Sequence, residues 1–230
     1  VFGEAIRDPR HREGPARDVL ERVEAGAIHE VWEHLEGRDD GRVERSIVTL
    51  ASDRALLLVG EPGCGKSWLS EHLAAAIGGN STLTIQGTAG TTEDHVKYSW
   101  NIARVIAEGP RPENMIPSPT MVAMKAGRLL RFEEITRCVP DVQDSLVSIL
   151  SDKAIAVPEL PDANMVWARP GFNVIATANT RDQGVNELSA ALKRRFNYVY
   201  IPVVADLQTE MEIVRQRSAR WILMPDVFSS

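Results

Sequence analysis

One run of eight residues has the residue types and the spacing that phosphate binding requires. It reads Gly60-Glu-Pro-Gly-Cys-Gly-Lys-Ser67 and matches the pattern G-x-x-x-x-G-K-S/T at every fixed position. Glycines let the backbone wrap around a phosphate, and a helix that begins there turns its positive end toward the same group. Lys66 is expected to reach the β- and γ-phosphates, and Ser67 to ligate Mg²⁺ through its hydroxyl. The run therefore predicts a site for ATP or ADP with Mg²⁺.

The predicted nucleotide contacts comprise this loop and the residue after it. They are Gly60, Glu61, Pro62, Gly63, Cys64, Gly65, Lys66, Ser67 and Trp68. The alternative is a glycine turn that merely precedes a helix. The surroundings disfavour it, because an apolar strand is expected at Ala55–Val59 and a helix at Ser67–Ile77, as the motif requires. Cys64 occupies a free position of the motif, and we interpret it as a small filler rather than a redox switch.

A second candidate motif is Leu129-Leu-Arg-Phe-Glu-Glu134, an apolar strand that ends in two acids. Transfer of a phosphoryl group to water needs a metal and an oriented nucleophile. We assign Glu133 to the metal shell, through a water, and Glu134 to polarising the attacking water. Arg131 lies inside the strand, where an unpaired charge is costly. The alternative is an edge strand followed by two solvated glutamates.

A third candidate is Asn179, which ends the apolar run Phe172–Ala178. In an open parallel sheet, ligands bind beyond the carboxyl ends of the strands. Asn179 is then expected beside the γ-phosphate and the attacking water. Taken alone, a strand-end asparagine more often caps a turn. The loop and the acid pair reverse that preference.

A short helix from Leu188 ends in a basic cluster, Lys193-Arg-Arg195, just before Phe196. Such a run is usually a solvated face. Here it precedes the last predicted strand, Tyr198–Val203, at the rim of the sheet, where a neighbouring subunit could bind.

The order of elements predicts an α/β protein with a P-loop NTPase parallel sheet flanked by helices. We expect a charged, mostly helical segment at residues 1–45, a nucleotide-binding core at 46–204, and the incomplete start of a helical lid at 205–230. Two pieces interrupt the core. Glu108–Ser118 is rich in proline and is interpreted as an insertion, and Ala154–Gly171 as a projecting β-hairpin with Trp167 as a candidate partner contact.

The net charge of −6 and a pI near 5.5 give no electrostatic reason to expect nucleic acid or an anionic membrane as a partner. The two cysteines, Cys64 and Cys138, do not suggest a disulfide framework. No apolar run reaches membrane-spanning length and no signal peptide is visible, so a cytoplasmic location is the expectation.

Together the motifs resemble those of the MoxR-type AAA+ ATPases, in the branch with an insertion in the second helix and a hairpin before the sensor strand. The resemblance covers about Ala51–Val203 and includes Pro140-Asp-Val-Gln-Asp-Ser-Leu146. It implies that Asn179 is the first sensor, and that the arginine finger is Arg195 first and Arg194 second. It further implies a homo-oligomeric ring, usually a hexamer, and a chaperone-like activity beside a partner with a von Willebrand A domain.

The leading interpretation is thus an ATPase that remodels a protein partner. One alternative is a nucleic-acid motor, against which the net charge argues. Another is a nucleotide-gated scaffold with little turnover, against which the pair Glu133–Glu134 argues.

Overall fold

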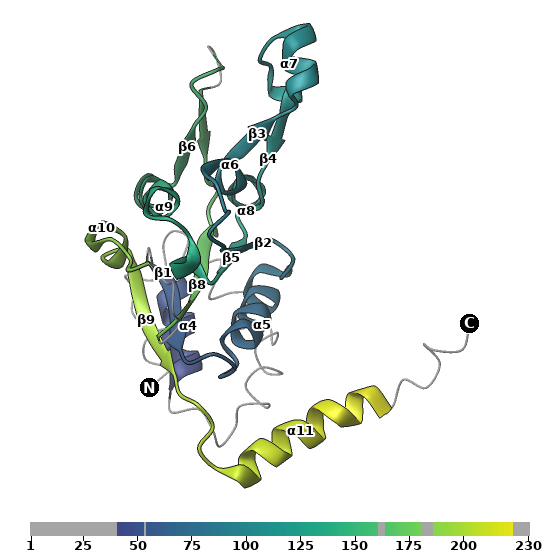
Figure 1. Cartoon of the computed structure of the whole chain (residues 1–230), viewed down its shortest axis with the longest axis vertical. Helices are drawn as coiled ribbons and strands as arrows, with labels where there is room; N and C mark the ends of the chain where they lie inside the picture. Colours follow the sequence, from purple (N-terminus) through teal and green to yellow (C-terminus); the bar gives the residue numbers. More distant parts are fainter. Residues whose placement is uncertain (1–40, 53, 161–163, 181–185, 223–230) are drawn as a thin grey trace.

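A central parallel sheet organises the chain. The computed structural model describes residues 41–52, 54–160, 164–180 and 186–222 (Figure 1). Five strands lie in the order β2-β5-β8-β1-β9, and every pairing is parallel. Their bounds are β1 Ala55–Gly60, β2 Thr84–Gln86, β5 Leu129–Glu133, β8 Asn173–Asn179 and β9 Phe196–Ile201. The α/β fold expected from the sequence is confirmed. β5 lies inside the sheet, so the edge-strand interpretation of the acid motif is wrong.

The central strands β1 and β8 are buried on both faces because helices cover both sides of the sheet. Side chains along a strand alternate between faces. Leu56 and Leu58 accordingly belong to one buried cluster and Leu57 to the other. One cluster joins the sheet to α4, Arg42–Leu50, and to α5, Lys66–Gly78.

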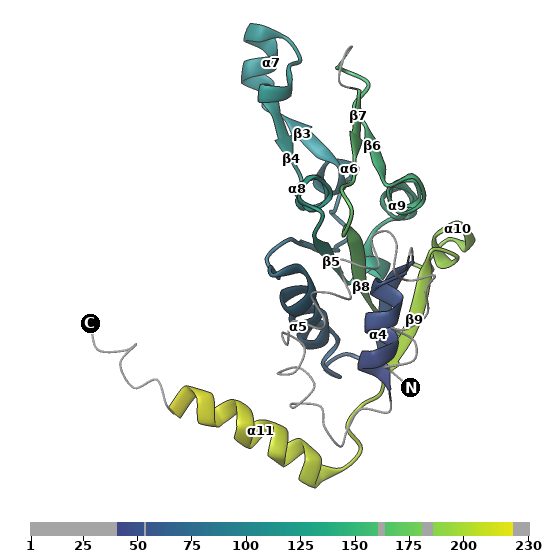
Figure 2. The same cartoon turned by 180° about the vertical axis from the view of Figure 1, so that it is seen from behind.

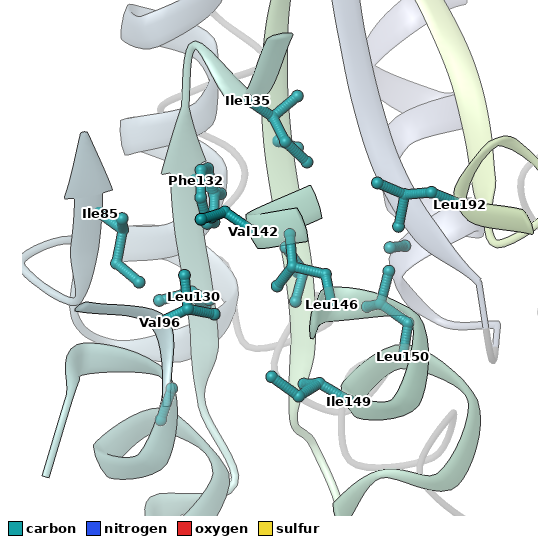
Figure 3. Close-up of a cluster of buried hydrophobic side chains, with 14 of the residues drawn as sticks. Ile85, Val96, Leu130, Phe132, Ile135, Val142, Leu146, Ile149, Leu150 and Leu192 are labelled. Atoms are coloured by element: carbon teal, nitrogen blue, oxygen red, sulfur yellow. The ribbon is translucent and has the colours of Figure 1, made fainter. Parts of the chain in front are cut away.

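The second cluster joins the other face to three helices, α6 Glu93–Val96, α8 Pro119–Ala126 and α9 Pro140–Asp152. Figure 3 shows its centre, where Phe132 of β5 meets Val142 of α9 and Leu146 follows one turn later. These side chains are at most 3% exposed. α9 is thereby fixed directly behind the strand that carries the acid pair.

Two projections leave the core on the side where the strands begin, opposite the end of β1 (Figures 1 and 2). One consists of β3 Tyr98–Trp100, α7 Ile102–Glu108, the 3₁₀ turn Pro112–Asn114 and β4 Met115–Pro117. The other is the hairpin of β6 Ala154–Ala156 and β7 Met165–Trp167. The hairpin is confirmed, whereas the first projection begins about ten residues earlier than the expected Glu108–Ser118.

The chain ends of the described part agree with the sequence in outline. α4 lies at the start of the described residues, and the segment expected to begin the lid contains α11, Leu207–Ile222, which extends away from the sheet in both views (Figures 1 and 2). The expected boundary at residue 45 falls within α4, whose Val43 and Ile47 are 1% exposed in the core. Most of the helical segment expected at residues 1–45 lies outside the described residues. None of the described helices is both long and apolar enough to span a membrane.

Candidate functional site

The loop between β1 and α5 has the backbone geometry that only glycine adopts easily. Gly63 and Gly65 have φ of 81° and 93°, in the left-handed region. A Cβ on Gly60 would lie 2.3 Å from the carbonyl oxygen of Ile201, so the strand end admits no side chain there. The fixed glycines of the motif are therefore required by the fold itself, before any ligand is considered.

Lys66 is 7% exposed and lies under this loop. Its Nζ donates to the carbonyl oxygens of Gly60, at 3.1 Å, and Glu61, at 2.7 Å. The Sγ of Cys64 is 3.6 Å away. The ammonium group is thus held at the centre of the loop, where a phosphate chain would meet it.

Ser67, in the first turn of α5, connects the loop to the acid motif. Its Oγ donates to Oε2 of Glu133 at 2.9 Å. The contact spans 66 residues of sequence, and it exists because β5 ends beside the start of α5. The two residues assigned to the metal from sequence are therefore neighbours in space.

Three further donors surround the Glu133 carboxylate. Ser70 Oγ lies 2.6 Å from Oε1, Thr177 Oγ1 lies 2.8 Å from Oε2, and Arg131 Nη2 lies 2.9 Å from Oε1. Burial by itself raises the pKa of the Glu133 carboxyl. The hydrogen bonds from Ser70, Thr177 and Ser67 and the charge of Arg131 outweigh burial, so the pKa lies below its ordinary value. Glu133 is a buried, ionised carboxylate.

Glu134 has a different environment. Its backbone φ of 53° is left-handed, a conformation uncommon outside glycine and often found at functional sites. Its carboxylate is partly exposed and lies 2.9 Å from Nε of Arg137. Gly87 at the end of β2 packs against this turn: its N–H donates to the carbonyl of Glu133 at 2.7 Å, and a Cβ on Gly87 would lie 2.5 Å from the carbonyl oxygen of Glu134.

Asn179 ends β8 directly beside the loop. It pairs with Gly60 in the parallel register, and the N–H of Thr180 donates to the carbonyl of Gly60 at 3.2 Å. The three sequence motifs thus converge at the carboxyl ends of three adjacent strands, β5, β8 and β1. This position agrees with the expectation for Asn179, whose role as a sensor stays a prediction.

Arg194 and Arg195 are at the opposite end of the sheet. They follow α10, Ala190–Lys193, and precede β9, whose Phe196 pairs with Ala55 at the start of β1. β1 has six residues, so the two ends of the strand are about 17 Å apart. The Arg195 guanidinium contacts Ser151 Oγ and donates from Nη1 to the carbonyl of Ala191 at 2.5 Å. The structure does not bring these arginines to the loop of their own chain.

The donor set at the loop fits a nucleotide with Mg²⁺. Mg²⁺ is usually bound by phosphates and waters with one or two protein oxygens, and the hydroxyl of Ser67 beside the carboxylate of Glu133 supplies these. In the described ranges no cluster of three or more His, Cys, Asp or Glu residues forms a self-contained metal site. The metal would therefore enter with the nucleotide.

Comparison with known proteins agrees with this geometry. The sequence profile of the AAA domain (dynein-related subfamily) matches residues 55–196, which is more than half of the chain. The chain belongs to this family of AAA domains. The match begins at β1 and ends at the start of β9, so it includes the loop, the acid pair and both arginines. Family membership supports a nucleotide-dependent ATPase.

Two curated relatives extend the comparison of this AAA domain. It is 55% identical over 179 residues to the uncharacterized protein YehL of Escherichia coli K12, a match that covers 77% of this chain and 49% of YehL. It is 26% identical over 228 residues to the gas vesicle ATPase GvpN1 of Halobacterium salinarum, covering 92% of this chain and 65% of that protein. The chain therefore spans about half to two thirds of the length of these relatives.

The fold of this AAA domain also resembles that of one chain in a structure of the complex between subunits BchI and BchD of magnesium chelatase. The TM-score is 0.57 at 18% identity, over 82% of this chain and 64% of the other. At this identity the likeness concerns the fold alone.

Two residues that contact Glu133 were not identified from the sequence, and a third was given no favourable role. Ser70 and Thr177 both donate to Glu133, and Arg131 was seen as a liability although it is an ion-pair partner. Ser70 had a local signal, since it lies three residues after Ser67 on the same helix face. The predicted roles of Trp68 and the remaining loop residues in binding stay predictions, and the Trp68 ring packs 4.1 Å from that of His72.

Proposed function

We propose that this AAA domain binds Mg-ATP at residues 60–67 and hydrolyses it, within a MoxR-type ring whose task is to remodel a protein partner. The observation that supports hydrolysis is the 2.9 Å hydrogen bond between Ser67 of the loop and Glu133 of the acid motif. It unites the two motifs that phosphoryl transfer needs in one place. A turn that only binds phosphate does not require a hydrogen bond to a buried, ionised carboxylate such as that of Glu133.

The residues divide the work as follows. The loop N–H groups and Lys66 would hold the phosphates. Ser67 and, through a water, Glu133 would hold Mg²⁺, which would supply positive charge to offset the charge that develops on the phosphates. Glu134 orients and polarises the attacking water, and Asn179 supports that water from the end of β8. Trp68 is proposed to border the nucleotide.

We propose further that the site is completed by a second copy of the chain. Charge develops on the transferred phosphoryl group, and an arginine finger is a common means of stabilising it. Arg195, or Arg194 beside it, lies on the far end of the sheet from its own loop, which suits a role in a neighbouring subunit's site. Arg195 is held by two contacts to its own chain, so its guanidinium is oriented in advance. In a closed ring, hexameric by analogy with the family, each chain supplies its arginine to the site of the next chain, so that every site is complete.

The two projections support the proposal of a remodeller. Both projections are connected to the acid pair. Along the chain, Glu134 is followed by α9 and then by β6. Gly87, whose N–H donates to the carbonyl of Glu133, is followed by α6 and then by β3. A change at the site therefore has a short structural route to each projection. Trp167 on the hairpin is 63% exposed and is the proposed partner contact. A partner with a von Willebrand A domain is the family's precedent.

Phosphate release from Mg-ATP by the purified protein tests the proposal. We expect turnover by the wild type and loss of most nucleotide affinity in Lys66→Ala, because that change removes the side-chain cation under the loop. Lys125→Ala, which alters an exposed lysine on α8, is the matched control. Near-normal ATP affinity in Lys66→Ala would contradict the assignment of the loop, and binding without turnover would favour the nucleotide-gated scaffold. Stimulation of turnover by DNA or RNA would instead favour a nucleic-acid motor.

A further inference from the structure

Arg131 joins three elements around the proposed metal side of the site. Its Nε donates to Ser70 Oγ at 3.1 Å, and its Nη1 donates to the carbonyl of Ser81 at 3.0 Å. Its Nη2 donates to the carbonyl of Ser67 at 3.3 Å and to Oε1 of Glu133 at 2.9 Å. One guanidinium thus ties β5 to α5 and to the segment before β2. Each of its three nitrogens has at least one acceptor.

The two oxygens of Glu133 are held from different directions. Oε1 accepts from Ser70 and Arg131, and Oε2 accepts from Ser67 and Thr177. A carboxylate has about four acceptor positions, so all are used. If the Ser67 hydroxyl turns to a metal, the acceptor position that it releases is on Oε2. Arg131 and Ser70 keep Oε1 fixed while this happens.

We propose that Arg131 is a positioning residue for the metal. It clamps Oε1 of Glu133 so that Oε2 faces Ser67 and the water shell of a nucleotide-bound Mg²⁺. This inference rests on the proposed Mg-ATP site and adds to it a role for Arg131, to which the sequence assignment of the acid motif gave none. Arg131 acts through Glu133 and does not itself touch the nucleotide.

Burial and side-chain chemistry explain why an arginine is needed. The side chains of Arg131 and Glu133 are 11% and 6% exposed. Removing one partner of such a pair leaves an uncompensated charge in a poorly solvated place. A lysine would restore the charge, but it has a single nitrogen and cannot reach three elements together. The pair therefore fixes the orientation of the carboxylate as well as its charge.

The test measures metal affinity without hydrolysis. The complex with ADP is titrated with Mn²⁺, and free Mn²⁺ is followed by electron paramagnetic resonance. Changing a residue that orients a metal ligand typically lowers metal affinity by about 10–100-fold. We expect a loss in this range for Arg131→Met, with ADP affinity in the absence of metal unchanged. Arg128→Met, which removes an exposed arginine just before β5, is the matched control and should bind Mn²⁺ like the wild type.

Two more variants separate positioning from a general loss of structure. Arg131→Lys keeps the charge and should still bind Mn²⁺ about tenfold more weakly, because the three-way clamp is lost. In a Glu133→Gln background, Arg131→Met should weaken Mn²⁺ binding no further, because Arg131 acts through Glu133.

The outcomes are distinguishable. A wild-type protein that binds no Mn²⁺ with ADP would overturn the proposed nucleotide site together with this inference. Wild-type binding with unchanged Mn²⁺ affinity in Arg131→Met and Arg131→Lys would overturn this inference alone. An equal loss from Arg131→Met with and without Glu133→Gln would also overturn it, since Arg131 would then act independently of the carboxylate.

Discussion

The two neighbouring acids at the end of β5 have different surroundings, which suit them to different proposed roles. Glu133 is buried among four donors that use both of its oxygens. Glu134 is partly exposed and forms an ion pair with Arg137 that solvent weakens. A group that must meet a water and exchange protons needs access, and a group that orients a metal needs rigidity. The environments therefore support the sequence assignment, in which Glu134 serves the water and Glu133 the metal.

The first prediction concerns Glu134→Gln. It should leave Mg-ATP bound and slow hydrolysis by about 10²–10⁴-fold, because the amide cannot polarise the water as a carboxylate does. Single-turnover hydrolysis and nucleotide binding are measured together. Asp144→Asn on α9 makes the same chemical change at an exposed position and should be near normal. Should Glu133→Gln give the bound but inactive protein while Glu134→Gln hydrolyses normally, the two roles are reversed.

The second prediction uses the two cysteines. Cys138 is fully buried, and burial raises the pKa of its thiol, against smaller opposing effects of hydrogen bonds from Thr91 and Thr88. The thiolate is the reactive form. A raised pKa keeps Cys138 protonated to higher pH, so it should resist alkylation in the folded protein at pH 8. Cys64, partly exposed in the loop, should be alkylated and should be protected by ATP.

Mass spectrometry of the alkylated protein counts and locates the modified cysteines. Unfolded protein should be modified at both positions, which is the control. Alkylation of Cys64 at the same rate with saturating ATP would contradict nucleotide binding at the loop.

At the scale of residues, the sequence predicts sites that are built from consecutive residues. The loop Gly60–Ser67 could be assigned because its function depends on consecutive residues. The environment of Glu133 could not, because Thr177 is 44 residues away and becomes a donor only through the β5–β8 register. Arg131 shows the same limit. An arginine in an apolar strand looks unfavourable in the sequence, because its hydrogen-bond acceptors on Ser70 and Ser81 become apparent only in the structure.

At the scale of elements, the two projections contact one another through Glu159, in the turn of the β6–β7 hairpin. Its carboxylate accepts from Tyr98 Oη at 2.8 Å and from Trp100 Nε1 at 3.3 Å, both on β3. The rings of Tyr98 and Trp100 meet edge to face at 6.0 Å. Burial and the bond to Glu159 raise the pKa of Tyr98, so it remains a hydrogen-bond donor at neutral pH. The projections are therefore expected to move together.

The third prediction is that Glu159→Ala uncouples them. Amide hydrogen exchange in residues 98–117 should become about threefold to tenfold faster, since two hydrogen bonds that fix this projection are lost. Exchange in β1 and β8 should not change. Glu113→Ala, an exposed acid on the same projection, serves as the control. Unaltered exchange in residues 98–117 would show that the two projections are held independently.

The extent of the first projection illustrates why element boundaries were harder to predict than the sheet. β3 and β4 have three residues each, too few for a visible alternation of apolar and polar side chains. Pro110, Pro112 and Pro117 marked an irregular segment, but the strand partner of Pro117 is Tyr98, far upstream. The two central strands β1 and β8, in contrast, are longer and mostly apolar runs, which the sequence shows directly.

At the scale of the whole molecule, the separation of Arg195 from its own loop leads to the fourth prediction. Arg195→Ala should abolish hydrolysis while ATP still binds, because an arginine finger contributes about 10³–10⁵-fold to the rate in well-studied phosphoryl transfer. Mixing Arg195→Ala with Glu134→Gln protein should restore partial activity, since some interfaces then combine an intact acid with an intact arginine. The same mixture with Arg194→Ala identifies which arginine acts.

The control for this experiment is subunit exchange, followed by energy transfer between labelled chains. Equal amounts of the two variants should recover activity only after exchange is complete. Absence of recovery in fully exchanged rings would exclude a site shared between chains.

The resting contacts of Lys66 have a consequence for which molecules the loop admits. Its ammonium is already bonded to the carbonyl oxygens of Gly60 and Glu61. An entering molecule has to replace these acceptors with better ones. Charged phosphate oxygens do so, because charge-assisted hydrogen bonds are roughly twice as strong as neutral ones. An uncharged nucleoside offers only hydroxyl and ring acceptors and gains nothing from the exchange. We therefore expect Lys66 to favour binding of phosphorylated compounds over their dephosphorylated counterparts.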